Sequence, residues 1–583
     1  MRGRVSRQNT LQHLGIKSSP NSGSRLCAEL LTNDGAAKCL ERGAGCGKLQ
    51  GAVLAHPFRQ QRRCDFHMSN NLFVLSVHGS KFLIFAQMGK SAWLWVLLAS
   101  LACWTVLSLG TGCKRNVFSE DPNLALRFSA DTILFDTVFA TIGSVTLPLK
   151  VYNPNDDAVR ISEIVLESGP SSAFRINADG MSGLEFEDLP LLPGDSLWIF
   201  VEVTVDPTND DTPFVVEDGI RFVTNGNEQR VQLAAWGANA FFHGGASDGF
   251  TALPCDDVWT PALPHVIYGI VEVDAGCTLT VLPGTDVYVH SGGGLLVYQS
   301  TLNALGTLEN PIVFQGDRLD DGYADLAGSW GIEFQVDFGP ESELFTVARG
   351  GIWLYGSIDS KMNHVHLRNG TIGLQVDTVG APNVPSLTMT NSIISNMSGI
   401  GMLAQGAKID GYNNLIYDCG QMCGAFTLGG TYRMDHCTFA NYWSDGVRQA
   451  PAVLLNDWYQ ALDGSNQIRS LEGSRFNNCI IWGNNASLDD FDELVADLAN
   501  PPASPLITQS AVDVQDEDFP FDLLSDCTTD AAPPFASTPD RDFHLTGNNA
   551  LWEGGNAQFP IATDLDGLPR VVGLPDKGCY ERQ

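Results

Sequence analysis

Apolar and polar residues alternate one by one along much of residues 124–240. The alternation is clear in LALRFSADTILFDTVFA, at the start of this stretch, and in DSLWIFVEVTVDP further on. Asn, Asp, Gly and Pro separate the alternating segments, as turns separate strands. A period of two is typical of strands with one buried face. About seven short strands in a stretch of this length predict a β-sandwich.

Residues 250–583 also contain short strands and turns, and helical segments do not separate the first strands. Strands without crossover helices can be parallel only if the chain coils as a solenoid. A repeat supports this fold, since similar phrases begin at intervals of 27, 23, 22 and 42 residues. These spacings indicate a coil near 22 residues with one double interval or long insertion. The phrases predict a ladder of polar side chains at one bend: His364, Asn391, Asn414, His436 and Asn478.

The two histidines of this ladder have two interpretations. We expect His364 and His436 to replace Asn as buried hydrogen-bonding groups. The alternative is a general base or a metal ligand in a groove. Cys437 and Cys479 share the next repeat position, which we expect to face the core as a stack of unreactive thiols.

Two parts of the sequence resemble known modules. VYNPNDDAVRISEI (151–164) and FVTNGNEQRVQL (222–233) resemble immunoglobulin-like domains beside the anchors of bacterial surface proteins. CTLTVLPGT (277–285) and LNALGTLENPIVF (302–314) closely resemble the entry coils of pectin-lyase-like β-helices. The resemblance implies an all-β chain, with an immunoglobulin-like β-sandwich followed by a right-handed parallel β-helix solenoid.

The closing segment DLDGLPRVVGLPDKGCYE (564–581) resembles the last segment of many surface β-helix proteins. That segment often ends in D-x-G-A-x-E, and Cys579 takes the place of Ala here. We expect it to cap the open end of the solenoid and protect its edge strands. The β-helix with its C-terminal cap is therefore assigned to residues 250–583.

Residues 88–112 have the pattern of a lipoprotein signal peptide. Lys90 precedes an uncharged apolar run that ends in small residues before Cys113. The pattern resembles the signals of bacterial, Bacteroidetes-type surface lipoproteins, which implies lipidation of Cys113 and residues 113–123 as a tether. An uncleaved transmembrane anchor is the alternative. We expect translation to start at Met88, so that residues 1–87 are a disordered upstream extension that is not part of the native protein.

Charge narrows the choice of partners. From Cys113 onward the chain has 21 basic and 63 acidic residues. Nucleic acid is therefore not an expected partner, because binding it needs clusters of Lys and Arg. No cofactor is expected, and Ca²⁺ is the one ion that the acidic balance leaves open. Cys419 and Cys423 have no second Cys or His pair to complete a zinc site, so no metal site is predicted.

The candidate chemistry lies in one acidic loop and one aromatic insertion. The loop GDRLDDGYADLAGSWG (316–331) provides the catalytic candidates Asp317, Arg318, Asp320, Asp321 and Asp325. The alternative is a simple connector between coils. Candidates for stacking on sugar rings are Tyr323 and Trp330 in the loop and Tyr442, Trp443 and Trp458 in the insertion. The alternative for the insertion is that its aromatic residues cover the solenoid core.

These features predict a lipid-anchored cell-envelope protein, an outer-membrane lipoprotein exposed at the surface. The membrane is its partner through the anchor, and the β-helix face binds a polysaccharide or a surface protein. The alternative is a polysaccharide lyase or glycoside hydrolase acting on an acidic polysaccharide, since β-helices host both kinds of function. Convergent carboxylates with a cation would favour the enzyme, and a smooth aromatic or polar face would favour binding.

Overall fold

The computed structural model describes residues 74–77 and 80–83 and most of residues 117–582. Within the last range it leaves out residues 140–142, 207–213, 246–249, 321, 337–344, 462, 485–491, 516–518, 530, 548–551, 555–561 and 571–573. The predicted signal peptide, Cys113 and the first residues of the tether lie outside the described residues. Of residues 1–87, it describes the antiparallel pair β1 (Val74–Val77) and β2 (Ser80–Leu83). No helix in the described part of the chain has the length and apolarity to cross a bilayer.

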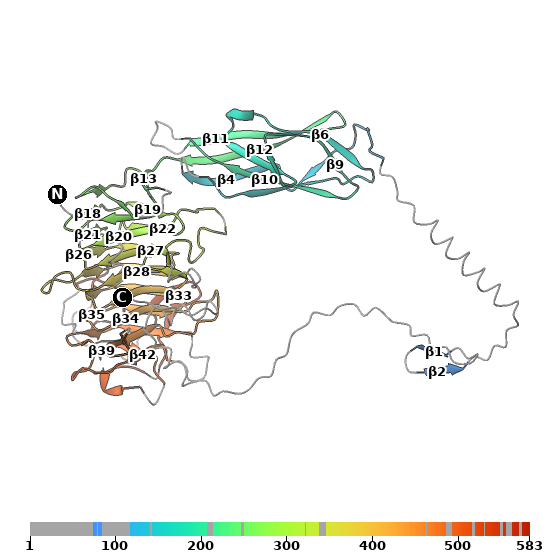
Figure 1. Cartoon of the computed structure of the whole chain (residues 1–583). Coiled ribbons are helices and arrows are strands. Elements are labelled where there is room, and N and C mark those ends of the chain that lie inside the picture. The colour runs from blue at the N-terminus through green and yellow to red at the C-terminus, as the bar shows by residue number, and fades with distance from the viewer. Residues whose placement is uncertain are drawn as a thin grey trace.

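The first large unit is a sandwich of two five-stranded sheets, as the alternation predicts (Figure 1). Sheet N1 contains β3 (Arg127–Phe128), β5 (Leu147–Tyr152), β10 (Ser196–Val203), β7 (Phe174–Ala178) and β8 (Met181–Gly183), in this order. Sheet N2 contains β4 (Thr132–Phe139), β12 (Asn227–Ala238), β11 (Phe214–Thr224), β6 (Val159–Leu166) and β9 (Glu185–Leu191). A short 3-10 turn, η1 (Gly169–Ser171), follows β6.

The period of two separates the two faces of each sandwich sheet. Along β10, Leu197, Ile199 and Val201 are buried between the sheets, while Trp198 and Phe200 point outward and are exposed. Neighbouring strands are antiparallel except β4 and β12, which run in parallel. Burial of one face therefore fixes the register of each strand.

The second unit is a solenoid of three parallel sheets, which confirms the predicted β-helix (Figure 1). Sheet S1 contains β13 (Phe241–Gly244), β16 (His265–Tyr268), β19 (Asp286–Val289), β22 (Ile312–Gly316), β27 (Val365–Arg368), β30 (Ile393–Met397), β33 (Leu415–Cys419), β36 (Thr438–Asn441), β41 (Ile480–Gly483) and β44 (Ala511–Val512). Sheet S2 contains β14 (Phe250–Ala252), β17 (Ile270–Val273), β20 (Gly294–Tyr298), β25 (Ile352–Tyr355), β28 (Ile372–Asp377), β31 (Ile400–Gln405), β34 (Met422–Thr427), β37 (Val453–Asn456) and β42 (Leu494–Asp497). Sheet S3 contains β15 (Val258–Trp259), β18 (Thr278–Val281), β21 (Thr301–Leu305), β26 (Ser360–Asn363), β29 (Leu387–Thr390), β32 (Lys408–Tyr412), β35 (Thr431–Asp435), β40 (Arg475–Asn477), β43 (Ile507–Thr508) and β45 (Leu524–Ser525).

Inward-facing residues of all three sheets form one continuous core along the solenoid. A disulfide between Cys255 and Cys277 joins the first coil to the second. Cys437 and Cys479 are free and buried, and burial raises the pKa of the Cys479 thiol well above its usual value. A buried, protonated thiol is a small apolar group rather than a nucleophile, in agreement with the predicted stack.

Four smaller elements project from the coils. The pair β23 (Glu333–Val336) and β24 (Phe345–Ala348) follows β22, and the pair β38 (Trp458–Gln460) and β39 (Asn466–Ile468) follows β37. The pair β46 (Phe535–Ser537) and β47 (Asp542–Leu545) and the 3-10 turn η3 (Phe521–Leu523) lie in the last part of the chain.

The strand register moves one member of the predicted ladder by one residue. Ile393, Leu415 and Thr438 are paired, so the bend residue between Asn391 and His436 is Asn413, not Asn414. All five members of the corrected row have φ between 46° and 53°: His364, Asn391, Asn413, His436 and Asn478. Among non-glycine residues, Asn and His are enriched in this left-handed conformation, which explains the composition of the row.

Two neighbouring pairs of the ladder are joined by side-chain contacts at hydrogen-bond distance. Asn413 Nδ2 donates to Asn391 Oδ1 at 3.1 Å, and Asn478 Nδ2 lies 3.1 Å from His436 Nε2. His436 is fully buried, and its Nδ1 lies 3.1 Å from the carbonyl oxygen of Asp576. Burial lowers the pKa of His436 to about 3, so a neutral imidazole serves as a hydrogen-bonding link in the stack.

The closing segment lies along the side of the coils, which corrects the predicted cap at their open end. Arg570 donates to Asn413 Oδ1 at 2.8 Å, and the Cys579 amide donates to Thr438 Oγ1 at 3.0 Å. Phe543, Leu565 and Cys579 cover the outer face of sheet S1. That face is apolar in these coils, so covering it removes apolar surface from water.

Candidate functional site

The sandwich and the solenoid meet at a small apolar contact. Phe139 and Ala238 at the ends of β4 and β12 pack against Val266 of β16, with Tyr288 and Leu319 at the edge of this cluster. The Phe139 and Tyr288 rings are 4.8 Å apart between centroids. The contact places the loop after β22 opposite the sandwich strand β4.

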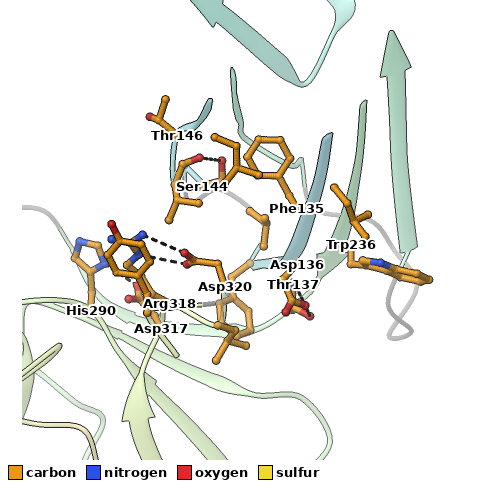
Figure 2. Close-up of a pocket in the computed structure, with 18 of the residues that line it drawn as sticks. Phe135, Asp136, Thr137, Ser144, Thr146, Trp236, His290, Asp317, Arg318 and Asp320 are labelled. Atoms are coloured by element: carbon orange, nitrogen blue, oxygen red, sulfur yellow. Dashed lines mark hydrogen bonds and ion pairs between the residues drawn. The ribbon is translucent and has the colours of Figure 1, made fainter. Parts of the chain in front are cut away.

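A cavity of about 890 Å³ lies between the two units beside this contact. The solenoid wall contains four of its polar residues, Asp317, Arg318 and Asp320 from the predicted acidic loop and His290 (Figure 2). The sandwich wall comes from β4, from the segment 143–148 and from Trp236 of β12. A volume of this size suits a few sugar units or another small polar ligand.

His290 and Asp317 lie in direct contact because of the solenoid register. Val289 is paired with Gly316, so the two residues that follow them are neighbours in adjacent coils. His290 Nδ1 lies 2.6 Å from Asp317 Oδ2, and the imidazole stacks on Tyr268 with 4.1 Å between centroids. Asp317 is largely buried and fixes the ring, so Nε2 is the nitrogen left for a ligand. Burial and the nearby Asp317 charge raise the pKa of the Tyr268 hydroxyl.

Arg318 contacts both a carboxylate and an aromatic ring. Its Nε and Nη2 donate to the two Asp320 oxygens at 3.3 and 3.2 Å. Its guanidinium carbon lies 3.4 Å from the centroid of the Tyr323 ring. Such a cation is held in place on two sides while remaining partly exposed.

The sandwich wall adds apolar and hydroxyl groups to the cavity. The Ser144 hydroxyl donates to the Val145 carbonyl and accepts from the Val203 amide, so two backbone groups hold it in place. The Thr137 amide donates to Asp136 Oδ1 at 2.7 Å. Phe135 and Trp236 also line this wall (Figure 2).

The other loop candidates do not join this group. Asp321 lies outside the described residues, and Asp325 is an exposed side chain that is not among the cavity-lining residues. Trp330 was a predicted stacking residue, but it is 1% exposed and belongs to the core, and its indole donates to the Arg368 carbonyl at 2.8 Å. That prediction is wrong, because the ring fills the interior at the base of the loop.

The aromatic residues of the insertion do not form one surface. Tyr442 packs against Phe535 of β46 and Phe543 of β47, and these contacts take it out of a binding face. Trp443 is half-buried before β37, and Trp458 is half-buried in the β38–β39 pair after that strand. This arrangement agrees with the alternative, in which the rings cover the solenoid beneath long loops.

Sheet S3 has a polar outer face. One column of paired, outward positions contains Asn303, Lys361, Thr388, Asp410, Arg433 and Arg475. Arg433 is 3.4 Å from Asp410, and Arg475 is 2.6 Å from Asp435. Burial and the charges of Asp410 and Asp435 raise the pKa of the neighbouring Tyr412 to about 12. Arg433 is therefore paired within the column, and Arg475 is paired with a carboxylate of the neighbouring column.

His290 is the polar residue of the solenoid wall that the sequence prediction missed. The signal was present, because His290 and Asp317 each directly follow a strand of the repeat. However, 27 residues separate His290 from Asp317, which is longer than the 22-residue repeat, so placing the two side chains side by side requires the strand register. Over the described residues, no group of three or more His, Cys, Asp and Glu side chains is arranged to hold a metal ion.

The fold and the site define an all-β protein with a sandwich and a right-handed β-helix. Residues 350–492 match the model of the right-handed β-helix region family. No curated protein matches the chain.

Among solved structures, the chain is similar to the XylC complex with xylose at 9% identity over 77% of this chain and 89% of that one, with a TM-score of 0.24. It is similar to the PapD-like domain 7 of human CEP192 at 12% identity over 22% and 96% of the two chains, with a TM-score of 0.15. The match to the VesB protease of Vibrio cholerae has 13% identity and a TM-score of 0.15, covers 19% of this chain and spans 31% of that protease.

Proposed function

We propose that this chain is a surface-exposed outer-membrane lipoprotein that binds a glycan at the cavity between its sandwich and its β-helix. Lipidation at Cys113 supplies the membrane anchor, and the sandwich joins the anchor to the solenoid. The signal-like residues 88–112 support the anchor. The described residues support the glycan site.

The observation that carries the glycan site is the convergence of His290, Asp317, Arg318 and Asp320 on one wall of the cavity. Sugars need donors and acceptors at fixed positions, and these side chains are held by their neighbours in the loop. The carboxylates of Asp317 and Asp320 are each paired with a cationic or imidazole group. Such paired groups favour binding over hydrolysis, which needs two carboxylates acting directly on the sugar.

The test is a titration of the purified full chain with a panel of neutral and acidic polysaccharides. We expect Arg318→Ala to weaken binding roughly tenfold, which corresponds to one charge-assisted contact. The matched control is Asp325→Asn, in the same loop but outside the cavity lining. Unchanged affinity in Arg318→Ala and Asp317→Asn would exclude the cavity as the site.

A polysaccharide lyase is the second candidate, and the His290–Asp317 pair favours it. A carboxylate that orients an imidazole prepares its other nitrogen to accept a proton. Arg318, at the same wall, would neutralise the uronate carboxylate during the abstraction of the neighbouring proton. As the proton leaves, the glycosidic C–O bond breaks, the departing sugar oxygen takes up a proton from water, and a double bond forms in the other sugar. The ultraviolet absorbance of this double bond is the readout. We expect His290→Gln to abolish that signal while polysaccharide binding persists. If the wild-type chain gives no such signal, the lyase candidate is rejected and binding is the function that remains.

A further inference from the structure

The outer face of sandwich sheet N1 has an exposed aromatic surface. Trp198 and Phe200 of β10 are 45% and 42% exposed, and their rings are nearly parallel with centroids 6.4 Å apart. Tyr152 extends this surface on the neighbouring strand β5, since it is half-buried at an outward position. Adjacent apolar rings that stay in contact with water are typical of binding sites.

The same face is locally basic in an acidic chain. Its outward positions include Arg127, Lys150 and Arg175, against the single carboxylate of Glu202. Lys150 Nζ lies 4.9 Å from the Trp198 ring and 5.1 Å from the Tyr152 ring, and the Arg127 guanidinium lies 4.9 Å from Tyr152. None of these three cations is in a salt bridge with a carboxylate of the described residues. The full chain has a net charge of −33, so this surface stands out in sign.

A hollow of about 640 Å³ adjoins the rings on the side of β7 and β8. Phe200 forms one side of it, and Arg175, Asn177, Ser182 and the carboxylate residue Glu202 supply polar groups. Asn177 Nδ2 donates to Ser182 Oγ at 3.1 Å, which holds the two side chains together. Thr146 lines both this hollow and the cavity between the two units. The two hollows therefore share an edge.

We propose that this face of sheet N1, named here the N1 face, binds an anionic polysaccharide whose sugars carry carboxylates. The apolar C–H face of a sugar ring packs against Trp198 or Phe200, while Lys150 and Arg175 receive its carboxylates. Fixed amide and hydroxyl groups in the hollow match sugar hydroxyls. The inference rests on the proposed function only in taking the ligand to be a glycan, and it assigns the sandwich a binding role.

The test uses the full chain and two probes, polygalacturonate and its fully methyl-esterified form, measured by calorimetric titration. We expect Phe200→Ala to weaken binding of both probes roughly tenfold, because it removes a stacking surface. Lys150→Gln and Arg175→Gln should weaken binding of polygalacturonate by a similar factor and leave the ester unaffected, because the ester has no charge to pair. Thermal unfolding of each variant confirms that the sandwich is intact.

Two matched controls limit the interpretation. Phe521→Ala removes a ring that is 47% exposed in η3 of the solenoid, and Arg160→Gln removes a cation of sheet N2. Neither should alter binding. The cavity variant Arg318→Ala separates the two proposals: losses only in the N1-face variants uphold this inference and reject the cavity, while losses only in Arg318→Ala do the reverse.

Four results would overturn the inference. The first two are that polygalacturonate does not bind the wild type, or that it binds the wild type and the N1-face variants equally well. Phosphatidylglycerol vesicles in place of polygalacturonate, with loss of vesicle binding in Phe200→Ala, would assign the face to a membrane. Sedimentation that shows self-association broken by Phe200→Ala would assign it to a second copy of the chain.

Discussion

Replacement of Asn414 by Ala tests the inner row of side chains beside the bend ladder. Asn414 is 2% exposed, its Nδ2 donates to the Met389 carbonyl at 2.8 Å, and its Oδ1 accepts from the Ser392 amide at 3.1 Å. Alanine removes both bonds, and the amide of Ser392, a residue that is 0% exposed, then loses its hydrogen-bond acceptor. An unsatisfied buried group of this kind costs about 1–3 kcal/mol.

The structure also supplies a rescue for this variant. In the same row, Ser392 accepts from the Val365 amide at 3.1 Å, and Ser510 accepts from the Cys479 amide at 2.9 Å. Asn414→Ser can keep the bond to the Ser392 amide, so we expect it to restore about half of the lost free energy of unfolding.

Two assays follow the change. Urea unfolding monitored by circular dichroism gives the free energy, and native-state hydrogen exchange of the Ser392 amide reports the local bond. The comparison is Gln405→Ala, a half-buried outward position of β31 that should cost less than about 0.5 kcal/mol. Equal, small losses at positions 405 and 414, with unchanged exchange at Ser392, would refute the assigned row.

Three further predictions test other parts of the chain. Cys113→Ala should release the protein from membranes, because each CH₂ of a lipid chain buried in the bilayer contributes about 0.8 kcal/mol to membrane binding. Membrane fractionation measures the release, and a variant that stays firmly bound would favour a transmembrane anchor. Folding lowers the pKa of His436 from its ordinary value of 6.5 to about 3, so the stability that depends on the neutral ring is complete above pH 6.5 and is lost as the pH falls toward 3. His436→Asn should therefore flatten the pH dependence of the melting temperature between pH 6.5 and pH 3. An unchanged slope would contradict this prediction. Glu493→Gln should cost about 3–5 kcal/mol in urea unfolding, because Arg448 and Glu493 form a buried pair at 2.5 Å with side chains 2% and 0% exposed, whereas a loss below about 1 kcal/mol would show that water or other groups replace the pair.

The architecture was predictable because burial leaves a period in the sequence. Strands with one buried face alternate, and stacked coils repeat a polar bend residue, so both units could be located before any coordinates. One adjacent pair of asparagines shows the limit of this reasoning. Asn413 and Asn414 fit the repeat equally well as residue types, and only the pairing of Leu415 with Ile393 and Thr438 decides between them.

The candidate site was predictable only in part, because its geometry depends on contacts between units. The acidic loop was found from its composition, but the sandwich wall opposite it has no counterpart in the loop sequence. Trp330 shows why composition misleads here, since an aromatic ring beside Asp and Gly residues fits a sugar-binding loop and a loop base equally well. Its 1% exposure decides the matter.

The closing segment also sets the order in which the molecule is completed. A chain emerges from the ribosome or from a secretion pore with its N-terminal side first, so sheet S1 is made before residues 535–580 arrive. Until then Leu415, Ala440 and Ile480 face water, although all three are buried in the finished protein. A nascent solenoid therefore has an exposed apolar flank, and docking of Phe543, Leu565 and Cys579 buries it. Chains interrupted before this segment would keep this flank exposed, so quality-control proteases and holdase chaperones would recognise them.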